Sequence, residues 1–312
     1  MTSVAVVGAG LIGRSWAVCF ARAGWTVRLW DPMTGASAAA CDYIAAMLPD
    51  MAAADLLGGH AAEDVLTRIT VIADLEDALQ GVHHVQENAP ENLEQKRRLF
   101  GDLDRFTPPE AVIASSTSAL LPSAFTGDLA GRARCIVAHP VNPPHLIPLV
   151  ELVPAPWTAP ATIDRTEVLM KDIGQAPVRL EHEIEGFLLN RLQAAVLDEA
   201  FRLVADGYGS AEAIDGCMRD GLAMRWSFMG PFETIDLNAP GGVRDYVERY
   251  QGMFRGLTDT MRQSADWAGP VLERIEADLR RKLAAADLPQ RQMWRDKKLM
   301  ALAAHRRAYS TD

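Results

Sequence analysis

The sequence predicts an α/β protein: a Rossmann-type, doubly wound sheet followed by an all-helical C-terminal domain. Two observations support this prediction. Short apolar runs alternate with helix-length segments over the first half of the chain, as is typical of parallel strands joined by crossover helices. From about residue 184 onward the apolar positions fall at helical spacing, and no alternating strand pattern recurs. We therefore expect two domains, residues 1–183 and residues 184–312.

The predicted elements follow one another in a regular order. Residues 4–7 form an apolar run, which a glycine turn joins to a helical stretch ending near Gly24. A second run ends at Asp31, and an Ala-rich helical excursion is expected from about 34 to 66. The longest helix of the second domain is expected to begin near Glu185. The remaining β-type runs cover residues 69–72, 84–86, 112–114, 136–138 and 178–180.

Composition limits the partners that this chain can have. Its 312 residues are 49% hydrophobic and carry a formal net charge of -10, which disfavours nucleic acids and anionic membranes. We find no apolar run long enough to span a bilayer and no signal-peptide pattern, so we expect a cytoplasmic protein. The four cysteines lack metal-binding spacing, so we expect neither a metal site nor disulfides.

A glycine-rich turn directly after the first apolar run is the clearest motif. Gly8, Gly10 and Gly13 complete the pattern G-x-G-x-x-G, and Leu11 and Ile12 open the following helix. Glycines in this setting permit a tight turn, the close approach of a pyrophosphate and close helix packing, while the helix N-terminus attracts negative charge. The motif predicts a dinucleotide site formed by these five residues.

Asp31 lies at the end of the second apolar run, 21 residues after Gly10. A carboxylate at this place accepts hydrogen bonds from the adenosine ribose hydroxyls and repels a 2′-phosphate. None of the three residues that follow is an arginine. The pattern therefore predicts NAD rather than NADP. For Asp31 alone, a helix cap or a turn is the alternative interpretation.

A polar loop, residues 87–92, follows the run at 84–86, and Pro90 with Glu91 indicates a helix start there. This loop is expected at the carboxyl edge of the sheet. Glu91, with Lys96 one turn further along, is then well placed to meet the ribose or nicotinamide of a cofactor. A capped helix with solvated charges is the alternative.

A histidine and a carboxylate suggest the chemistry. His139 closes an apolar strand, and the prolines that follow make the next loop rigid. Glu151 lies inside the apolar run 147–153, where a carboxylate is costly to bury without a partner. If the chain doubles back after residue 144, Glu151 reaches His139 and orients it as a general base for alcohol oxidation. A structural histidine and a solvent-facing Glu151 are the alternatives.

Two further polar groups are candidates for substrate contact. The hydroxyls of residues 115–118 follow a strand at the carboxyl edge, where they can bind a reacting oxygen or cap the next helix. Asn190 lies in an apolar helix, and an amide in that setting needs a hydrogen-bond partner. Facing a cleft, it would bind substrate.

Taken together, these motifs resemble the 3-hydroxyacyl-CoA dehydrogenase superfamily over essentially the whole chain. All of them fall in the family's order and at its spacing: the glycine fingerprint, Glu91-Asn92-Leu93 with Lys96, residues 115–120, residues 139–143, Glu151, and Gly186-Phe187 with Asn190-Arg191.

The resemblance assigns roles to individual residues. It implies that His139 is the base paired with Glu151 and that Ser118 and Asn190 contact the substrate. It also implies that Glu91 and Lys96 join Asp31 at the NAD cofactor. We add Asn142, in the loop after His139, to the substrate-binding residues.

Within the superfamily, residues 139–144 and 147–154 look most like the lambda-crystallin branch. So do Arg225-Trp226 and residues 230–234 with Leu237-Asn238. This resemblance implies L-gulonate 3-dehydrogenase activity, NAD as cofactor and a homodimer formed through the helical domain. Carnitine dehydrogenases and short 3-hydroxybutyryl-CoA dehydrogenases are close relatives, so their activities are the alternatives.

The excursion after the second strand bears on the substrate. In acyl-CoA enzymes, as the resemblance has it, this segment helps to hold CoA, whose phosphates call for basic residues. Residues 33–67 contain no lysine or arginine, but they contain five acids: Asp42, Asp50, Asp55, Glu63 and Asp64. An acidic face of this kind disfavours CoA, so we expect a small free hydroxy acid or a betaine-like acid.

A free carboxylate substrate needs a cation. Arg225 is the candidate and Arg191 the second choice, although Arg225 can equally be a surface or interface residue. A reading of a different class is a non-catalytic, crystallin-like NAD-binding protein. A non-catalytic member of the family should have lost the base or its partner. Both His139 and Glu151 are present, which argues against this alternative.

Overall fold

The computed structural model describes residues 2–261 and 264–309, which form two compact units. The first contains the chain up to Leu189 together with the segment from Gln292 onward, and the second contains residues Asn190–Arg291. The division expected from the sequence, 1–183 and 184–312, therefore differs at the C-terminus. The last segment returns to the first unit because its apolar side chains pack there, which helical periodicity alone does not reveal.

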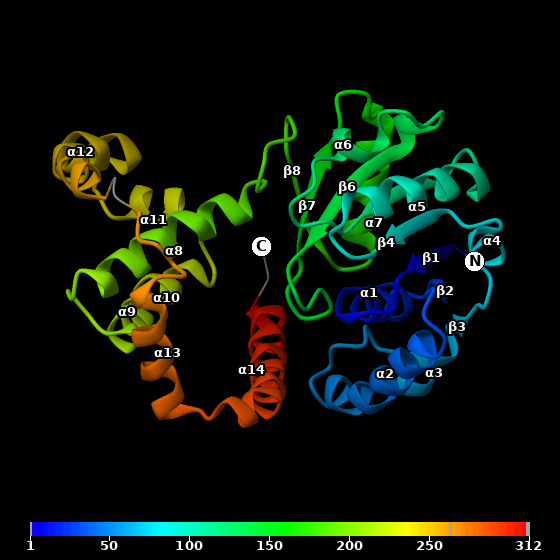
Figure 1. Cartoon of the computed structure of the whole chain (residues 1–312), viewed down its shortest axis with the longest axis horizontal. Coiled ribbons are helices and arrows are strands. Elements are labelled where there is room, and N and C mark those ends of the chain that lie inside the picture. The colour runs from blue at the N-terminus through cyan, green and yellow to red at the C-terminus, as the bar shows by residue number, and fades with distance from the viewer. Residues whose placement is uncertain (1, 262–263, 310–312) are drawn as a thin grey trace. The chain divides into compact units, whose positions relative to one another are not determined.

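The first unit is built on a sheet whose described strands follow the order β3-β2-β1-β4-β5-β6-β7-β8 (Figure 1). Strands β1 to β6 are parallel, β7 is antiparallel to β6, and β8 is parallel to β7. The strands are β1 (Ser3–Val7), β2 (Thr26–Trp30), β3 (Ile69–Val71), β4 (His84–Glu87), β5 (Val112–Ser115), β6 (Cys135–Pro140), β7 (Leu149–Pro154) and β8 (Ala176–Arg179). Since the order reverses between β1 and β4, a ligand is expected outside the carboxyl ends of these strands.

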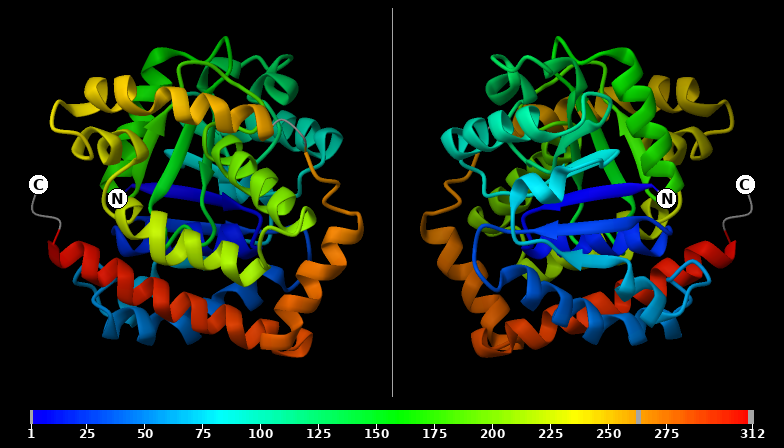
Figure 2. Two further views of the ribbon diagram at one scale, coloured as in Figure 1. Left: turned by 90° about the vertical axis from the view of Figure 1, so that its left-hand side faces the viewer. Right: turned by 90° about the vertical axis from the view of Figure 1, so that its right-hand side faces the viewer.

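Helices cover both faces of this sheet (Figures 1 and 2). Val4 and Val6 of β1 enter one core, whereas Ala5 and Val7 enter the other, because successive side chains of a strand point to opposite faces. Burial on both faces explains why the strands read as continuous apolar runs. The doubly wound α/β fold predicted from the sequence is confirmed.

The two faces carry different helices. Residues of α1 (Leu11–Arg22), α2 (Ala36–Ala53), α3 (Ala62–Thr67) and α7 (Pro160–Asp172) belong to one core. Residues of α4 (Leu75–Leu79), α5 (Leu93–Phe106) and α6 (Pro122–Thr126) belong to the other. Helices α2 and α3 make up the helical excursion expected between the second and third strands.

Helix α5 begins later than its sequence signals suggest. Pro90 and Glu91 indicated the start, but the first helical residue is Leu93. The side chain of Asn92 accepts a hydrogen bond from the Gln95 amide at 3.0 Å and caps the helix. An asparagine cap satisfies an amide that would otherwise lack a partner, and this gain decides the boundary.

The C-terminal helix α14 (Leu288–Tyr309) joins the first unit from Gln292 onward. Met300 is buried in the same core as α1 and α2, with Leu299 and Ala303 partly buried beside it. Figure 2 shows α14, in red, running beside the blue helices of the excursion. Burial of this apolar stripe holds the end of the chain against the nucleotide-binding unit.

The second unit is helical throughout its described residues, as the sequence predicted. Its helices are α8 (Leu189–Ala205), α9 (Ala211–Gly216), a π-helical turn (Cys217–Leu222), α10 (Ala223–Trp226), α11 (Pro231–Leu237), α12 (Gly242–Thr260) and α13 (Pro270–Lys282). Helix α8 does not begin near Glu185 as expected. Gly186 and Phe187 have φ angles of +75° and +49°, which a right-handed helix cannot contain.

The described part of the chain contains neither a membrane-spanning helix nor a cluster of metal-binding side chains. Among residues 2–261 and 264–309, no helix is long and apolar enough to cross a membrane. Within the same residues, no group of three His, Cys, Asp or Glu side chains could hold a metal ion. The four cysteines are free thiols.

Candidate active site

The glycine turn lies at the carboxyl end of β1, and its three glycines meet different surroundings. Gly8 has a φ of +96°, and a Cβ there would lie 2.9 Å from the Asn88 carbonyl oxygen. A Cβ on Gly13 would lie 1.8 Å from the Gly8 carbonyl oxygen. Gly10, in contrast, has nothing within 4 Å of the Cβ position. The first and third glycines permit the fold, and the second leaves room for a ligand.

The same turn presents the N-terminus of α1. Gly10 is the cap residue and makes no side-chain hydrogen bond, so the first amides of α1 are not satisfied by a side-chain cap. Leu11 is 60% exposed at this end. Open space beside Gly10 and a helix N-terminus fit the pyrophosphate of a dinucleotide.

Asp31 follows β2 beside this turn. Its Oδ2 accepts the Ala9 amide at 2.7 Å, and its Oδ1 accepts the Met33 amide at 2.9 Å. The helix-cap alternative does not describe this residue, because α2 begins at Ala36 after Gly35. Each carboxylate oxygen retains a lone pair, so Asp31 can still accept hydrogen bonds from ribose hydroxyls.

A carboxylate and a lysine are buried at the carboxyl ends of β4 and β5. The Lys96 ammonium lies 2.8 Å from both oxygens of Glu87, and both side chains are 0% exposed. Ser115 donates to Glu87 at 2.6 Å, and the Ala89 amide donates to the other oxygen of Glu87 at 2.6 Å. This hydrogen-bond network makes the carboxyl ends of β4 and β5, next to the loop 87–92, rigid.

The loop after β4 is tied to the loop after β5 through Glu91. Its carboxylate accepts the Thr117 hydroxyl at 2.9 and 2.6 Å through its two oxygens, and it also accepts the Ser118 amide. The next helix, α6, has no side-chain cap, so the hydroxyls of residues 115–118 do not cap it. Glu91 therefore holds the backbone that carries Ser118.

His139 and Glu151 meet across β6 and β7. They are register partners in the antiparallel pair, and His139 Nδ1 lies 2.8 Å from Glu151 Oε2. Glu151 Oε1 accepts the amides of Leu188 and Leu189 at 2.8 and 2.9 Å. Since a carboxylate only accepts, Nδ1 carries the imidazole proton and Nε2 is left as the basic nitrogen.

The surroundings of Glu151 keep it ionised. Burial raises the pKa of this carboxyl, but the hydrogen bonds from His139, Leu189 and Leu188 outweigh burial and hold the pKa below its ordinary value of 4.5. The solvent-facing alternative for Glu151 is wrong, because its side chain is almost fully buried.

Comparison with known families accounts for this arrangement. The family model for the 3-hydroxyacyl-CoA dehydrogenase NAD binding domain matches residues 3–184, and the model for the C-terminal domain of the same family matches residues 186–274. The chain belongs to the 3-hydroxyacyl-CoA dehydrogenase family. It is an NAD-dependent oxidoreductase of that family, as the resemblance implied, and the match confirms NAD as the cofactor.

Relatives within the family differ in what they are named for. The chain is 45% identical to a lambda-crystallin homolog of Mus musculus over 303 residues, which is 96% of this chain and 95% of the relative. It is 40% identical over 248 residues to an L-carnitine dehydrogenase of Streptomyces griseus, covering 79% and 73% of the two chains. The resemblance to the lambda-crystallin branch is thereby confirmed.

A solved structure extends the similarity to the fold. The crystal structure of a 5-formyl-3-hydroxy-2-methylpyridine 4-carboxylic acid 5-dehydrogenase, described as an NAD+-dependent dismutase, superposes with a TM-score of 0.83. The two sequences are 26% identical, and the match covers 99% of this chain and 98% of that one.

Two residues expected at the family's cofactor site lie differently from the expectation. Lys96 is fully buried against Glu87, so the alternative of a solvated charge is wrong for it. Glu91 is exposed, but its carboxylate already holds residues 117 and 118. Both side chains therefore have protein partners in this structure, and their contact with a cofactor stays a prediction.

The substrate candidates fall into both units. Ser118 and Asn142 are exposed in loops after β5 and β6, at the sheet edge that carries His139. Asn190 begins the second unit, one residue after Leu189, whose amide Glu151 accepts. Arg225 is exposed in the second unit, where it donates to Asn238 at 3.3 Å. The structure thus brings His139 and Glu151 together. Asn190 and Arg225 belong to the second unit.

Sequence reasoning missed a polar cluster beneath the glycine turn. The Ser116 hydroxyl accepts from Trp16 at 2.9 Å and from Gln86 at 2.8 Å, and it donates to Asn88 at 2.8 Å. The backbone of Asn88 in turn packs against Gly8. The available signal was a run of polar residues, 86–88, directly at a strand end in an otherwise apolar sheet.

Some acidic side chains of the excursion have cationic partners in the folded chain, which the sequence alone did not indicate. Lys297 lies 3.6 Å from Asp50, and Arg307 lies 2.5 Å from Asp55, both cations coming from α14. Two of the five acids counted in the sequence are therefore paired. Repulsion of a polyphosphate by this segment is weaker than the local charge count suggested.

Proposed function

We propose that this enzyme oxidises the 3-hydroxyl of a small free hydroxy acid, as an L-gulonate 3-dehydrogenase does. The observation that carries the proposal is the buried pair of His139 and Glu151 beside the carboxyl edge of an NAD-binding sheet. NAD, when bound, would supply the hydride acceptor for the carbon that bears the hydroxyl. The base, its orienting carboxylate and polar groups for the oxygen then come from the chain itself.

His139 is proposed as the general base. Glu151 holds the Nδ1 proton, so Nε2 points its lone pair away from the carboxylate and takes the proton of the substrate hydroxyl. The ionised Glu151 then stabilises the imidazolium that results. Ser118, Asn142 and Asn190 are proposed to bind the substrate, and Ser118 and Asn190 to stabilise the developing carbonyl.

The cofactor groups are proposed on the same basis. The glycine turn and the N-terminus of α1, from Gly8 to Gly13, would hold the pyrophosphate, and Asp31 the adenosine ribose. Glu91 lies at the edge expected for the nicotinamide ribose. Lys96 is proposed to stabilise that edge of the sheet through its buried ion pair with Glu87.

A free acid is favoured over a CoA thioester for two reasons. The excursion contains no lysine or arginine of its own to hold CoA phosphates. The relatives reported above include a lambda-crystallin homolog and an L-carnitine dehydrogenase, whose name specifies a free acid. We propose Arg225 as the cation for the substrate carboxylate, with Arg191 as second choice.

The test is NADH formation at mildly alkaline pH with L-gulonate, L-carnitine, free 3-hydroxybutyrate and its CoA thioester. Turnover of a free acid is expected, and Arg225→Gln should then raise KM for that acid with little change in KM for NAD. Turnover of the thioester alone would reject the free-acid proposal. Failure of all four substrates with purified, NAD-binding protein would favour a non-catalytic, crystallin-like role.

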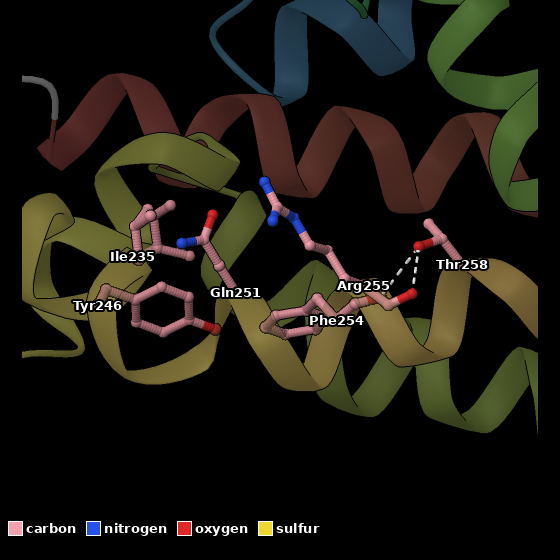
Figure 3. Close-up of a pocket in the computed structure, with 7 residues that line it drawn as sticks. Ile235, Tyr246, Gln251, Phe254, Arg255 and Thr258 are labelled. Atoms are coloured by element: carbon pink, nitrogen blue, oxygen red, sulfur yellow. Dashed lines mark hydrogen bonds between the residues drawn. The ribbon is translucent and has the colours of Figure 1, made fainter.

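A homodimer through the second unit is proposed as well. Apolar side chains are exposed along α8 and α12, among them Leu192 at 64% and Phe254 at 46%. A pocket of about 410 Å³ lies on α11 and α12. Figure 3 shows Ile235, Tyr246 and Phe254 among the residues that line it. Apolar surface of this kind supports an interface with a second copy. Light scattering of the wild type and of Phe254→Asp tests the dimer, and a monomeric wild type would reject it.

The cytoplasmic location stays a prediction.

A further inference from the structure

We propose that Phe187 is a positioning residue for the His139 base. It covers the imidazole with its ring and, through its backbone, directs two amides onto Glu151. The proposal rests on the proposed role of His139. It extends that role to a residue whose side chain has no polar atom.

The ring of Phe187 lies against the imidazole. The two ring centroids are 5.4 Å apart with an interplanar angle of 57°, and the Phe187 side chain is 0% exposed. His139 is itself only 5% exposed. A dry wall on this side strengthens the hydrogen bond between His139 and Glu151, because water cannot compete for either partner.

The backbone of Phe187 is in the left-handed region. Its φ of +49° follows the φ of +75° at Gly186, and a bulky side chain rarely adopts such an angle unless its surroundings enforce it. Directly after this turn, the amides of Leu188 and Leu189 both donate to Glu151 Oε1. The unfavourable turn therefore has a structural result: it supplies two of the hydrogen bonds that hold Glu151.

Both features concern the same carboxylate and base. Glu151 uses one oxygen for His139 and the other for the turn that Phe187 makes. A phenylalanine chosen only to fill the core would not need a left-handed backbone, since an ordinary φ serves that purpose without strain. The combination of ring contact and turn points to the orientation of the base.

Two variants separate these contributions from simple packing. Phe187→Gly removes the ring but allows the left-handed turn without strain, because glycine has no Cβ. Phe187→Leu restores apolar bulk beside His139. Leu180→Ala is the matched control, since Leu180 belongs to the same core cluster, is 6% exposed and has no aromatic ring.

The first readout does not depend on a substrate. Diethyl pyrocarbonate acylates neutral imidazole nitrogens, and the rate at His139 is followed by peptide mass spectrometry. We expect Phe187→Gly to raise this rate about tenfold or more relative to wild type, because the ring no longer shields the imidazole. Phe187→Leu should return most of the protection, and Leu180→Ala should leave the rate within about twofold. An unchanged rate in Phe187→Gly would overturn the proposal.

The second readout is catalysis with L-gulonate, or with whichever hydroxy acid of the panel the wild type oxidises. Phe187→Gly should lower kcat by roughly 10- to 100-fold while the Kd for NADH, from fluorescence titration, stays within about twofold. Leu180→Ala should lower Tm without this loss of kcat. A wild type that oxidises nothing contradicts the proposed function, whereas an active wild type with an equally active Phe187→Gly contradicts the role of Phe187.

Discussion

His139 and Glu151 face each other as register partners on β6 and β7, with Nδ1 and Oε2 2.8 Å apart. Directly opposed residues of an antiparallel pair project from the same face of the sheet, so the reversal of the chain after β6 is what brings the imidazole and the carboxylate together. The second oxygen of Glu151 holds the amides that precede α8. One buried carboxylate thus holds both the His139 imidazole and the start of a helix.

Replacing this carboxylate should impair catalysis more than cofactor binding. Glutamine has a single carbonyl oxygen, so in Glu151→Gln it cannot accept both from Nδ1 and from the two amides. We expect kcat to fall by roughly 10²- to 10⁴-fold while the Kd for NADH stays nearly constant. Glu183→Gln is the control. Glu183 also accepts a backbone amide, but its partner is Ser123, at 3.0 Å, and not His139. A Glu151→Gln enzyme within twofold of wild type would disprove the pairing.

The three glycines of the turn should respond differently to alanine. In Gly13→Ala the new Cβ would meet the Gly8 carbonyl at 1.8 Å, so the helix must move and Tm should fall by several degrees. In Gly10→Ala the Cβ enters open space at an allowed φ of -67°, so folding should be unaffected. The methyl group there obstructs the pyrophosphate, and Kd for NADH should rise at least about tenfold. An unchanged Kd in Gly10→Ala would mean that the cofactor lies elsewhere.

The buried ion pair beneath the site should be essential to folding as a pair. In Lys96→Met the Glu87 carboxylate loses its cation in a fully buried place, which we expect to reduce the free energy of unfolding by about 3–5 kcal/mol. Changing both residues, Lys96→Met with Glu87→Gln, should recover part of the loss. The surface pair of Lys171 and Glu167 is the control: Lys171→Met should change the free energy of unfolding much less than Lys96→Met does. Urea unfolding measures all four proteins.

The stability of the protein should depend on pH through a buried histidine. Burial, reinforced by Arg22, Arg14 and Arg295, lowers the pKa of His145 from 6.5 to about 3, and neither ring nitrogen has a hydrogen-bond partner. Because the folded-state pKa is the lower one, the unfolded chain binds more protons between these values, and stability is lost as the pH falls below 6.5. His145 alone should remove about 2 kcal/mol between pH 7 and pH 5.

His145→Phe tests this dependence. The variant deletes two buried nitrogens without partners, so it should be neutral or stabilising at pH 7 and should flatten the decline toward pH 5. His182→Gln, at an exposed position, should retain the decline of the wild type. His84, whose pKa burial lowers to about 4, should account for a further part that remains in His145→Phe. Equal slopes in wild type and His145→Phe would contradict the assignment.

Much of the site was predictable because its signals are local. The glycine turn, Asp31 and the strand-end histidine lie where short apolar runs stop, and a parallel sheet collects its strand ends at one edge. Glu151 was predictable from a different signal, a carboxylate inside an apolar run, which demands a partner. The helix starts at Leu93 and Leu189 were displaced from their predicted places because an asparagine cap and a left-handed turn decided them.

The amino-acid sequence by itself determined the class of fold and NAD as the cofactor, and it indicated that Glu151 needs a partner such as His139. These signals lie in short stretches of the chain: apolar runs, a glycine turn and a carboxylate inside an apolar run. Only the tertiary structure decided that Lys96 is buried against Glu87, that cations of α14 pair with Asp50 and Asp55, and that the ring of Phe187 lies against the His139 imidazole. Those contacts join residues whose partners depend on how helices pack on the sheet, and burial, which sets their energies, exists only once the chain has folded.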